Sequence, residues 1–300
     1  MAKHWSTEIE LVGAGGEPVD LWRTLSSHGV ADLLPNVLDE KARVLETTLP
    51  LPRGSARTIR IGTGERGRAL VDGEDVAARD AAVLEETARY MLRLDADLSG
   101  FYEAARDDPD LAWACSGAGR MLRSPTVFED VVKTICTTNC AWSATVRMAT
   151  ALVSELGLEA PDGRRTFPAP EAMAEASEGF YKDAVRAGYR GPYLRSIAAE
   201  VAEGSLDLES LNDPELPDDE VAERLLALPG CGPYATAHMM MLLGRNSRLI
   251  LDSWTRPKYA RLNGRKASDR TIERRFRRYG DHAGLAFWLT LTRDWVDEQP

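Results

Sequence analysis

The stretch of sequence that decides the fold is LLALPGCGPYATAHMMMLLGRNSRLILDSWTRPKY, residues 225–259. A helical pattern ends at Leu228, and a tight turn of proline and glycine follows. Pro233 then stands where proline is tolerated, in the first turn of a second helix. The sequence therefore predicts a helix-hairpin-helix motif at about residues 218–245.

The glycines of this hairpin indicate contact with another molecule. Gly230 and Gly232 allow the backbone to approach a ligand closely. The amides around them and at the start of the second helix are expected to point outward, and the helix dipole would strengthen such a site for an anion. A phosphate diester would fit without any reading of bases. The alternative is a joint that only packs one helix on the other.

Asp252 is the second notable residue of this stretch. It lies twenty residues after Gly232, follows the apolar run Leu249–Leu251 and precedes Ser253 and Trp254. A carboxylate that emerges from apolar surroundings is either a helix cap, here for a helix starting near Ser253, or a functional acid. Both interpretations can hold for one residue.

The first eighty residues differ from the rest of the chain. Short β-prone runs alternate there with turns rich in glycine and proline, and a short helix is expected at residues 21–27. From Asp80 onward the apolar spacing is helical. We therefore predict an α+β fold that is mainly α-helical, with an N-terminal antiparallel β domain at residues 1–80 and a helical domain at residues 81–300.

The charge of the chain is unevenly distributed. The net charge is −10, which alone argues against a polyanionic partner. Between Arg256 and Arg278, however, ten basic side chains stand against Asp269 and Glu273. The local charge is +8, which leaves −18 for the rest of the chain. We therefore expect a small basic footprint, with a solvated helix face as the alternative for some of these arginines.

Composition and cysteine content predict a cytoplasmic protein. The chain is 44% hydrophobic and 28% charged, which excludes disordered and fibrous classes. No apolar run approaches the roughly 20 residues needed to span a bilayer, and no signal-peptide core follows the N-terminus. Cys136 and Cys140 could suit a metal, but only Cys231 and no nearby histidine would complete the site. We expect free or buried thiols and no metal ligands, and His28, His238 and His282 are too dispersed for a metal centre.

Several of these motifs together resemble the helix-hairpin-helix (HhH-GPD) DNA glycosylases. The hairpin LPGCGPY at 228–234, its spacing to Asp252 and the helical region carry this resemblance. GRMLRSP at 119–125 and ICTTN at 135–139 are similar to segments of the 8-oxoguanine branch, and AGYRGPY at 187–193 is similar to its wedge loop. The N-terminal sheet also fits the 3-methyladenine branch.

The resemblance implies an enzyme that turns a nucleotide out of duplex DNA and cleaves its N-glycosidic bond. Asp252 would be the catalytic carboxylate, stabilising an oxocarbenium-like sugar and orienting water. Bifunctional members carry a lysine two residues after the second hairpin glycine, where this chain has Tyr234. A phenol forms no Schiff base, so we expect a monofunctional glycosylase without lyase activity. Lys258 is the alternative nucleophile.

The resemblance also implies roles in DNA and base binding. Asn139 would contact the orphaned partner base, and Tyr189 with Arg190 would form the wedge beside it. An aromatic and apolar base pocket would replace the hydrogen-bonding pocket of the 8-oxoguanine branch, although a helical core would look similar. The expected pocket residues are Trp142, Trp254, Phe287 and Leu291, and the expected DNA-backbone residues are Gly230, Cys231, Gly232, Tyr234, Arg256 and Lys258.

The expected partner is double-stranded DNA that contains a damaged or modified base, bound by a monomer without a membrane partner. No cysteine follows Cys231, so the iron-sulfur cluster of some family members is not expected. The hairpin carbonyls could hold a monovalent cation, and no other cofactor is predicted. Two alternatives stay open: a glycosylase directed at a deliberately hypermodified base in foreign DNA as a defence, and a non-catalytic protein that binds DNA structures.

Overall fold

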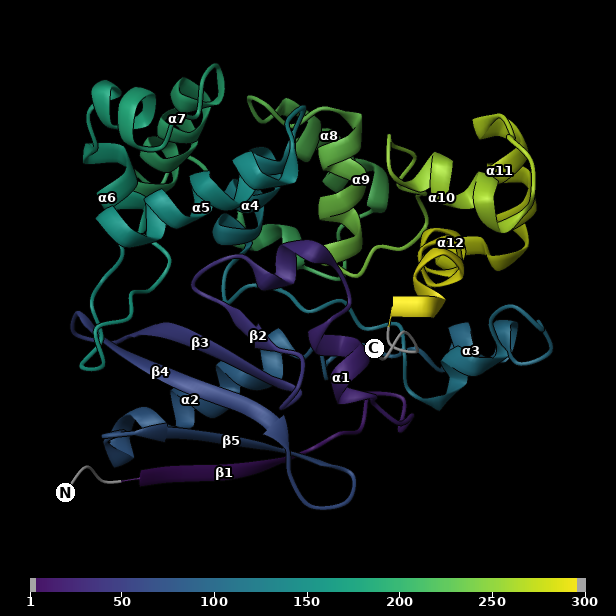
Figure 1. Ribbon diagram of the computed structural model, residues 1–300, viewed down its shortest axis with the longest axis horizontal. Helices are drawn as coiled ribbons and strands as arrows, with labels where there is room; N and C mark the ends of the chain where they lie inside the picture. The colour runs from purple at the N-terminus through teal and green to yellow at the C-terminus, as the bar shows by residue number, and fades with distance from the viewer. Residues whose placement is uncertain (1–3, 296–300) are drawn as a thin grey trace.

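An antiparallel sheet lies beside a larger body of helices in the computed structural model, which describes residues 4–295 (Figure 1). This arrangement confirms the predicted α+β class. The strand order is β1-β5-β4-β3-β2, and every neighbouring pair is antiparallel. The strands are β1 (His4–Glu10), β2 (Val37–Asp39), β3 (Val44–Leu51), β4 (Ser55–Thr63) and β5 (Arg68–Glu74).

Alternating apolar residues give the sheet its buried face. Leu45 of β3 pairs with Ile61 of β4, and Ile61 pairs in turn with Val71 of β5, and all three side chains are fully buried. Such period-two burial is what the sequence pattern encodes in β1, β3, β4 and β5. The sequence did not reveal β2, because a three-residue edge strand is too short to display alternation.

Twelve α-helices, joined beyond residue 78 by links that range from a few residues to about twenty, account for most of the other regular structure between residues 4 and 295. In chain order they are α1 (Leu21–Leu25), α2 (Ala78–Met91), α3 (Ser99–Ala105), α4 (Val127–Thr137), α5 (Trp142–Leu156), α6 (Pro170–Glu175), α7 (Arg190–Ala202), α8 (Asp218–Ala227), α9 (Pro233–Leu242), α10 (Thr255–Leu262), α11 (Asp269–Phe276) and α12 (Ala283–Thr292).

Helix α2 packs against the sheet. Its residues Leu84, Ala88 and Met91 are fully buried in the same apolar cluster as the strands. Burial of a leucine or methionine side chain stabilises the fold by about 1.5–3 kcal/mol. The packing unit of the sheet therefore extends past residue 80 to the end of α2, while the domain boundary at residue 80 stays a prediction.

A break divides the apolar stripe of residues 127–156 into α4 and α5. The hydroxyl groups of Thr137 and Thr138 donate hydrogen bonds of 2.7 Å to the carbonyls of Thr134 and Ile135 at the end of α4. Asn139 follows with a φ of +45°, a left-handed conformation that an α-helix cannot contain. The break leaves Asn139 exposed on a loop.

A buried ion pair joins the N-terminal segment to the helical body. The guanidinium of Arg120 bonds to the carboxylate of Glu17 and also donates to the Ala96 carbonyl at 3.1 Å, and both side chains are buried. Glu17 in turn accepts a 2.8 Å hydrogen bond from the amide of Leu98. Removal of one partner from such a pair costs about 3–5 kcal/mol. This pair therefore fixes the strand-like segment that includes Leu122 against the loop before α1.

The segment around residue 28 is held from two sides. The amide of Leu122 donates to Ser27 Oγ at 2.9 Å, and the indole of Trp288 on α12 donates to the Ser27 carbonyl at 2.9 Å. His28 also bonds to the Leu122 carbonyl, at 2.6 Å. These long-range bonds bring the N-terminal segment into the cavity described below.

Candidate active site

Helices α8 and α9 and the turn at residues 228–232 form the predicted helix-hairpin-helix motif. Gly230 has a φ of +86°, which L side chains rarely adopt, and a Cβ there would lie 2.9 Å from a ring carbon of Tyr193. A Cβ at Gly232 would meet nothing within 4 Å. Gly230 is therefore required by the turn, whereas Gly232 leaves open space at the start of α9.

The hairpin amides divide into free and occupied groups. Within residues 4–295, no acceptor takes a hydrogen bond from the amide of Gly230 or Gly232. The amide of Cys231 instead donates to the Leu228 carbonyl at 3.1 Å, and its side chain is buried. The structure thus corrects the prediction for Cys231, because the turn itself already uses its amide.

Asp252 forms the helix cap that was one of the two roles considered for it. Its Oδ1 accepts hydrogen bonds from the amides of Trp254 at 2.8 Å and Thr255 at 2.6 Å. The amide of Asp252 donates in return to Thr255 Oγ1 at 2.8 Å, which closes a reciprocal cap at the start of α10. No residue between 4 and 295 donates a hydrogen bond to Oδ2. One oxygen therefore fixes the carboxylate and the other stays available to a ligand.

The Asp252 carboxyl group lines a cavity of about 790 Å³. Four indole rings form much of its wall, from the side chains of Trp142, Trp254, Trp288 and Trp295. The Trp254 ring lies 5.6 Å from both the Trp288 and Trp295 rings, centroid to centroid. Planar aromatic walls of this kind suit a flat, stacked ligand.

Two of the four predicted pocket residues line this cavity and two do not. Trp142 and Trp254 lie at the cavity, as expected. Phe287 and Leu291 are fully buried, and Phe287 packs against Phe276 at 5.2 Å between ring centroids. The prediction was wrong for these two residues because it chose the wrong face of α12.

The correct face of α12 is one residue away. A shift of one position rotates a side chain by about 100° around a helix. Trp288 follows Phe287 directly and lines the cavity, together with Trp295 seven residues later. Trp295 lies beyond the end of α12, in the 3-10 helix Arg293–Trp295, so helical spacing within α12 could have identified Trp288 alone.

Tyr234 also lines the cavity, and its contact with the DNA backbone stays a prediction. Its hydroxyl lies 3.3 Å from Thr137 Oγ1, and its ring stacks on His238. Burial raises the pKa of Tyr234, and the nearby Asp252 carboxylate raises it further, although the Thr137 hydrogen bond acts in the opposite direction. Tyr234 therefore presents a neutral phenol inside the cavity.

Two loops next to the cavity carry the predicted wedge and orphan-base residues. Asn139 is exposed and lines the cavity, and Tyr189 is 50% exposed. Arg190 is buried instead, and its guanidinium donates to the carbonyl and, at 3.2 Å, to the hydroxyl of Thr138. Arg190 thus ties the two loops together, which corrects its prediction as a residue that reaches DNA.

The two basic residues predicted to contact the DNA backbone are already paired. Arg256 makes a bidentate ion pair with Asp269, with N···O distances of 2.8 and 2.9 Å. Lys258 forms an ion pair with Asp294, and its side chain is 14% exposed. Lys258 also does not line the Asp252 cavity. Both side chains are therefore engaged in ion pairs within the protein, and their predicted contacts with the DNA backbone stay predictions.

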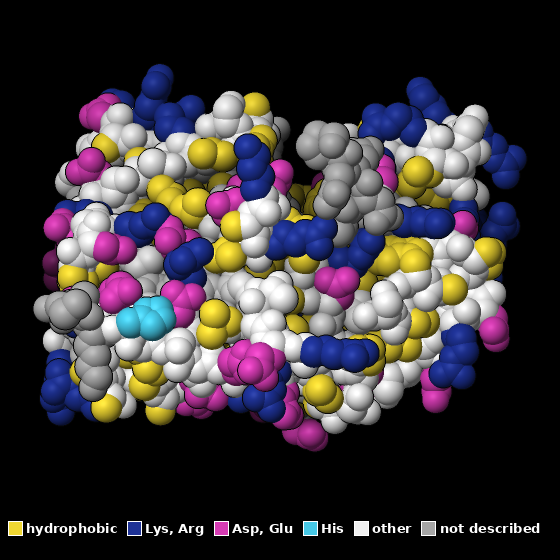
Figure 2. Space-filling view, turned by 60° about the horizontal axis from the view of Figure 1, so that its bottom comes forward, with side chains coloured by type: hydrophobic (Ala, Val, Ile, Leu, Met, Phe, Trp, Pro, Cys, Tyr) yellow, Lys and Arg dark blue, Asp and Glu magenta, His cyan; other side chains and the backbone are white. Residues whose placement is uncertain are grey.

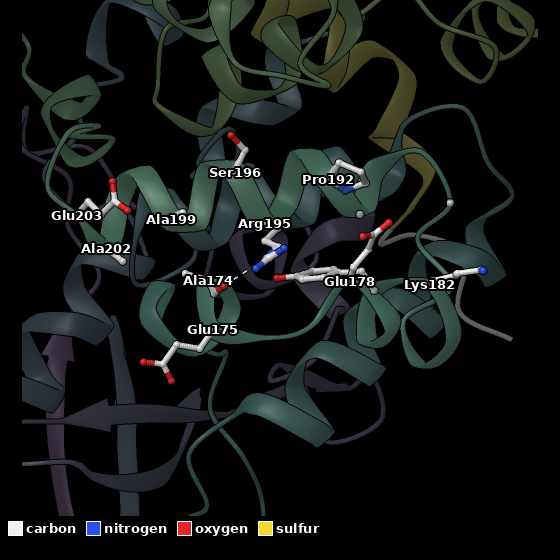
Figure 3. Close-up of a pocket in the computed structure, with 13 residues that line it drawn as sticks. Ala174, Glu175, Glu178, Lys182, Pro192, Arg195, Ser196, Ala199, Ala202 and Glu203 are labelled. Atoms are coloured by element: carbon white, nitrogen blue, oxygen red, sulfur yellow. Dashed lines mark hydrogen bonds between the residues drawn. The ribbon is translucent and has the colours of Figure 1, made fainter.

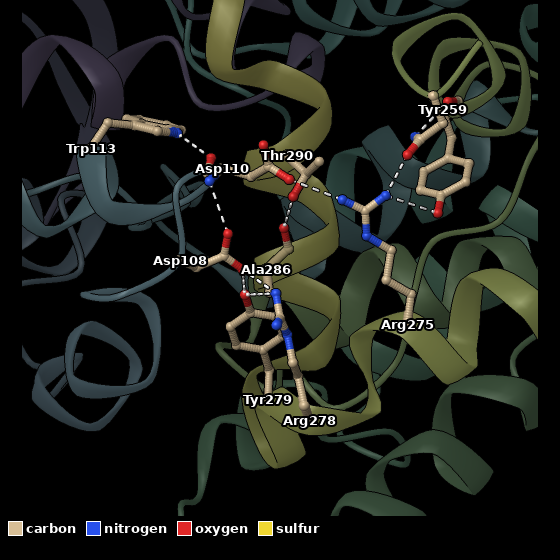
Figure 4. Close-up of polar contacts among 10 residues, drawn as sticks. Asp108, Asp110, Trp113, Tyr259, Arg275, Arg278, Tyr279, Ala286 and Thr290 are labelled. Atoms are coloured by element: carbon tan, nitrogen blue, oxygen red, sulfur yellow. Dashed lines mark hydrogen bonds and ion pairs between the residues drawn. The ribbon is translucent and has the colours of Figure 1, made fainter.

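Acidic residues near α3 neutralise two more arginines of the basic segment (Figure 4). Arg275 bonds to Asp110 at 2.9 Å, and Arg278 bonds to Asp108. Basic side chains nevertheless gather on the side of the molecule that carries α10 and α11 (Figure 2). Six members of the segment are exposed and form no ion pair within residues 4–295: Arg261, Arg265, Lys266, Arg270, Arg274 and Arg277.

A second cavity, of about 920 Å³, lies between α6 and α7 (Figure 3). Glu175, Glu178 and Glu203 line it, and Arg195 donates to the Ala174 carbonyl at 3.4 Å. Lys182 also lines it, and Asp252 is not among its lining residues. The tryptophan-lined cavity is therefore the candidate active site.

The four cysteines are free, and Cys136 and Cys231 are buried. Between residues 4 and 295, no three His, Cys, Asp or Glu side chains form a group that could hold a metal ion. No helix in the same range is long and apolar enough to cross a bilayer.

Solved structures of known proteins share this architecture. The 3-methyladenine DNA glycosylase of Archaeoglobus fulgidus superposes with a TM-score of 0.72 at 21% identity, over 96% of this chain and 98% of its own. The Clostridium acetobutylicum 8-oxoguanine glycosylase/lyase, in complex with double-stranded DNA containing cytosine opposite 8-oxoguanine, also gives 0.72, at 18% identity over 100% and 99%. The chain has the DNA glycosylase fold.

Sequence similarity covers less of this glycosylase-fold chain. YfjP of Bacillus subtilis strain 168, provisionally named a DNA-3-methyladenine glycosylase, is 30% identical over 88 residues. The match spans 29% of this chain and 30% of YfjP. No protein-family model matches the chain. The expected relationship is thus confirmed at the level of the fold.

Two buried histidines that lie far apart in the sequence meet at the cavity. The rings of His28 and His238 form a T-shaped pair with centroids 5.8 Å apart. Burial lowers the pKa of His28 to about 3, helped by His238 and Lys133, and burial lowers the pKa of His238 to about 4. Both imidazoles are therefore neutral at neutral pH. The sequence did not predict this pair because only the tertiary fold joins the two segments.

These depressed pKa values predict how stability depends on pH. An unfolded histidine titrates near 6.5, so below this pH the unfolded chain binds protons that the folded chain excludes. The stabilisation that the two neutral histidines contribute is present above pH 6.5. It is lost as the pH falls toward their pKa values in the folded protein. Replacing His238 by Gln should reduce the loss of unfolding free energy between pH 7 and pH 5 by about 2 kcal/mol. Urea unfolding of the wild-type and His238→Gln proteins at pH 7 and pH 5 measures this difference. Equal losses of unfolding free energy in the two proteins would contradict the prediction.

Proposed function

We propose that this chain is a monofunctional DNA glycosylase that turns a damaged or modified base out of duplex DNA and hydrolyses its N-glycosidic bond, leaving an abasic site. The observation that carries the proposal is the Asp252 carboxylate, fixed through Oδ1 and open at Oδ2, in a cavity walled by indole rings. The fold shared with two classes of DNA glycosylase supports it.

The cavity can replace the stacking that a base loses when it leaves the DNA double helix. Extrusion of a nucleotide costs a few kcal/mol, mainly in lost stacking and pairing. Stacking of a base on an aromatic side chain is worth about 1–3 kcal/mol. The rings of Trp142, Trp254 and Trp288 can therefore offset the extrusion, and the volume of about 790 Å³ accommodates a base with its sugar.

Asp252 supplies the electrostatic part of the reaction. Cleavage of the N-glycosidic bond leaves positive charge on the sugar, in an oxocarbenium-like transition state. A carboxylate that is already oriented stabilises this charge without reorganisation at the moment of reaction. The amides of Trp254 and Thr255 provide that orientation, while Oδ2 can face the sugar and accept a proton from attacking water.

The absence of a suitable amine favours water as the nucleophile. Attack by an amine on the sugar would need a lysine close to Asp252. Tyr234 occupies the corresponding position with a neutral phenol, and no lysine lies among the described residues that line the cavity. Hydrolysis without strand cleavage is therefore the chemistry that these side chains support.

The surroundings of the cavity can receive a DNA duplex. Asn139 and Tyr189 are exposed on loops that Arg190 links, and an exposed tyrosine ring can fill the space of an extruded base. The free amides of Gly230 and Gly232 can bind a phosphate at the start of α9. A duplex across these elements would present one nucleotide to Asp252.

Replacement of Asp252 by Asn tests the proposed chemistry. Asn keeps an oxygen that can accept the cap hydrogen bonds but removes the negative charge, so DNA binding should persist while base release falls by at least about a hundredfold. Release is measured as alkali-labile sites in a panel of duplexes with alkylated, oxidised or hypermodified bases.

Borohydride reduction of the wild-type reaction provides the matched control for the nucleophile. A hydrolytic enzyme should yield no trapped protein-DNA complex, so efficient trapping would overturn the monofunctional assignment. Near-normal base release by the Asp252→Asn protein would show that Asp252 is not the catalytic carboxylate. Binding without release from any duplex in the panel would favour a non-catalytic DNA-binding protein.

The exposed arginines predict the salt dependence of DNA binding. Each phosphate contact contributes about one to the slope of log affinity against log salt. The triple variant Arg261→Gln, Arg265→Gln and Arg270→Gln should reduce this slope by about one to three, because all three side chains are exposed and unpaired within residues 4–295. Arg278→Gln, which removes an arginine already paired with Asp108, is the control and should change the slope less. Equal effects of the triple variant and of Arg278→Gln on the slope would contradict the assignment of the unpaired arginines to phosphate contacts.

A further inference from the structure

We propose that His28 and His238 select the base: Nδ1 of His28 accepts a hydrogen bond from an N–H group of the extruded base, and Nε2 of His238 meets a polar atom beside it. The cavity would therefore favour bases that carry an amino group over bases that offer no N–H donor. This inference rests on the proposed function, since it concerns the base held near Asp252.

The hydrogen bond to Leu122 fixes the tautomer of His28. The Nε2 atom lies 2.6 Å from the Leu122 carbonyl oxygen, which can only accept, so Nε2 carries the proton. Burial keeps the imidazole neutral at neutral pH. A neutral imidazole protonated at Nε2 presents a lone pair at Nδ1. His28, whose side chain lines the cavity, is therefore a hydrogen-bond acceptor at Nδ1.

That acceptor has no partner within the protein. The Nδ1 atom of His28 is buried and makes no hydrogen bond with any residue between 4 and 295, although the side chain lines the cavity. The Nε2 atom of His238 is in the same position. A buried polar atom left unpaired costs about 1–3 kcal/mol, and folded proteins rarely leave two side by side. The pair is thus arranged to be completed by a ligand.

The neighbours of the two histidines define the shape of that ligand. The His238 ring stacks on Tyr234, with centroids 6.2 Å apart and planes 27° apart, and the His28 ring meets His238 edge to face. Trp142 and Trp254 line the same cavity. Aromatic walls hold a planar molecule by its faces, which leaves its edge to the histidines. A nucleobase has both features, with flat faces for stacking and an edge that carries donors and acceptors.

Chemical complementarity narrows the class of base. His28 can only accept at Nδ1, whereas no hydrogen bond fixes the tautomer of His238, so its Nε2 can donate or accept. An exocyclic amino group offers hydrogens to both rings. A pocket built around a fixed acceptor discriminates strongly against a ligand that lacks the donor, because the acceptor is then left buried and unpaired.

Binding of duplexes that differ in one amino group tests the proposal. The Asp252→Asn protein is titrated with three duplexes that contain purine, 2-aminopurine or adenine opposite an abasic-site analogue, where extrusion costs least. At least one of the two aminopurine duplexes should bind about tenfold more tightly than the purine duplex, as expected for one additional hydrogen bond.

A substitution of His28 then locates the source of this preference. His28→Gln retains an N–H that can reach the Leu122 carbonyl but lacks the acceptor at the Nδ1 position, so the preference for the aminopurine duplexes over the purine duplex should disappear. His238→Phe, which keeps the ring and removes both nitrogens, provides a second variant should His28→Gln fail to fold, and it should reduce the preference.

Equal binding of all three duplexes by the Asp252→Asn protein, or a preference that survives both substitutions, would overturn the proposal. The outcome is separable from the proposed reaction, because binding is measured without catalysis. A preference that depends on His28 in a protein that releases no base would refute the hydrolysis alone. Base release by the wild-type protein without this preference would refute the recognition alone.

Discussion

The reciprocal hydrogen bonds between Asp252 and Thr255 are the constraint on which the site depends. The Oδ1 atom of Asp252 caps the start of α10, whereas Oδ2 stays available to a ligand in the cavity. A cap of this kind stabilises a helix by about 1 kcal/mol, a modest gain. Its larger consequence is that the charge sits in one orientation before any substrate arrives, which is what electrostatic catalysis requires.

The sequence predicted the parts of the molecule that short spacing encodes. The hairpin around Gly230, the cap at Asp252 and four of the five strands depend on residues within a few positions of one another, so their signals survive in the linear chain. Tyr234 was predicted at the position that decides the nucleophile. Its side chain lines the cavity, next to His238 one turn further along α9.

The parts that the sequence did not predict depend on tertiary contacts. His28 reaches the cavity only because Leu122 and Trp288 hold the Ser27 segment from opposite sides. The pairing of Lys258 with Asp294 and of Arg275 with Asp110 likewise joins distant segments, so the local charge of +8 overstated the free basic surface. The pocket face of α12 was missed for a different reason, since an offset of a single residue exchanges the core face for the cavity face.

In the proposed reaction, Asp252 stabilises positive charge on the sugar of an extruded nucleotide. The most direct measurement compares the affinity of the protein for two duplexes, one with a cationic pyrrolidine in place of the target sugar and one with an uncharged tetrahydrofuran. A transition-state mimic should bind more tightly than its neutral counterpart. We predict that the wild-type protein prefers the pyrrolidine duplex by at least about tenfold, as expected for a close charge pair, and that Asp252→Asn loses this preference. A preference of equal size in the two proteins would show that the Asp252 carboxylate does not stabilise positive charge on the sugar.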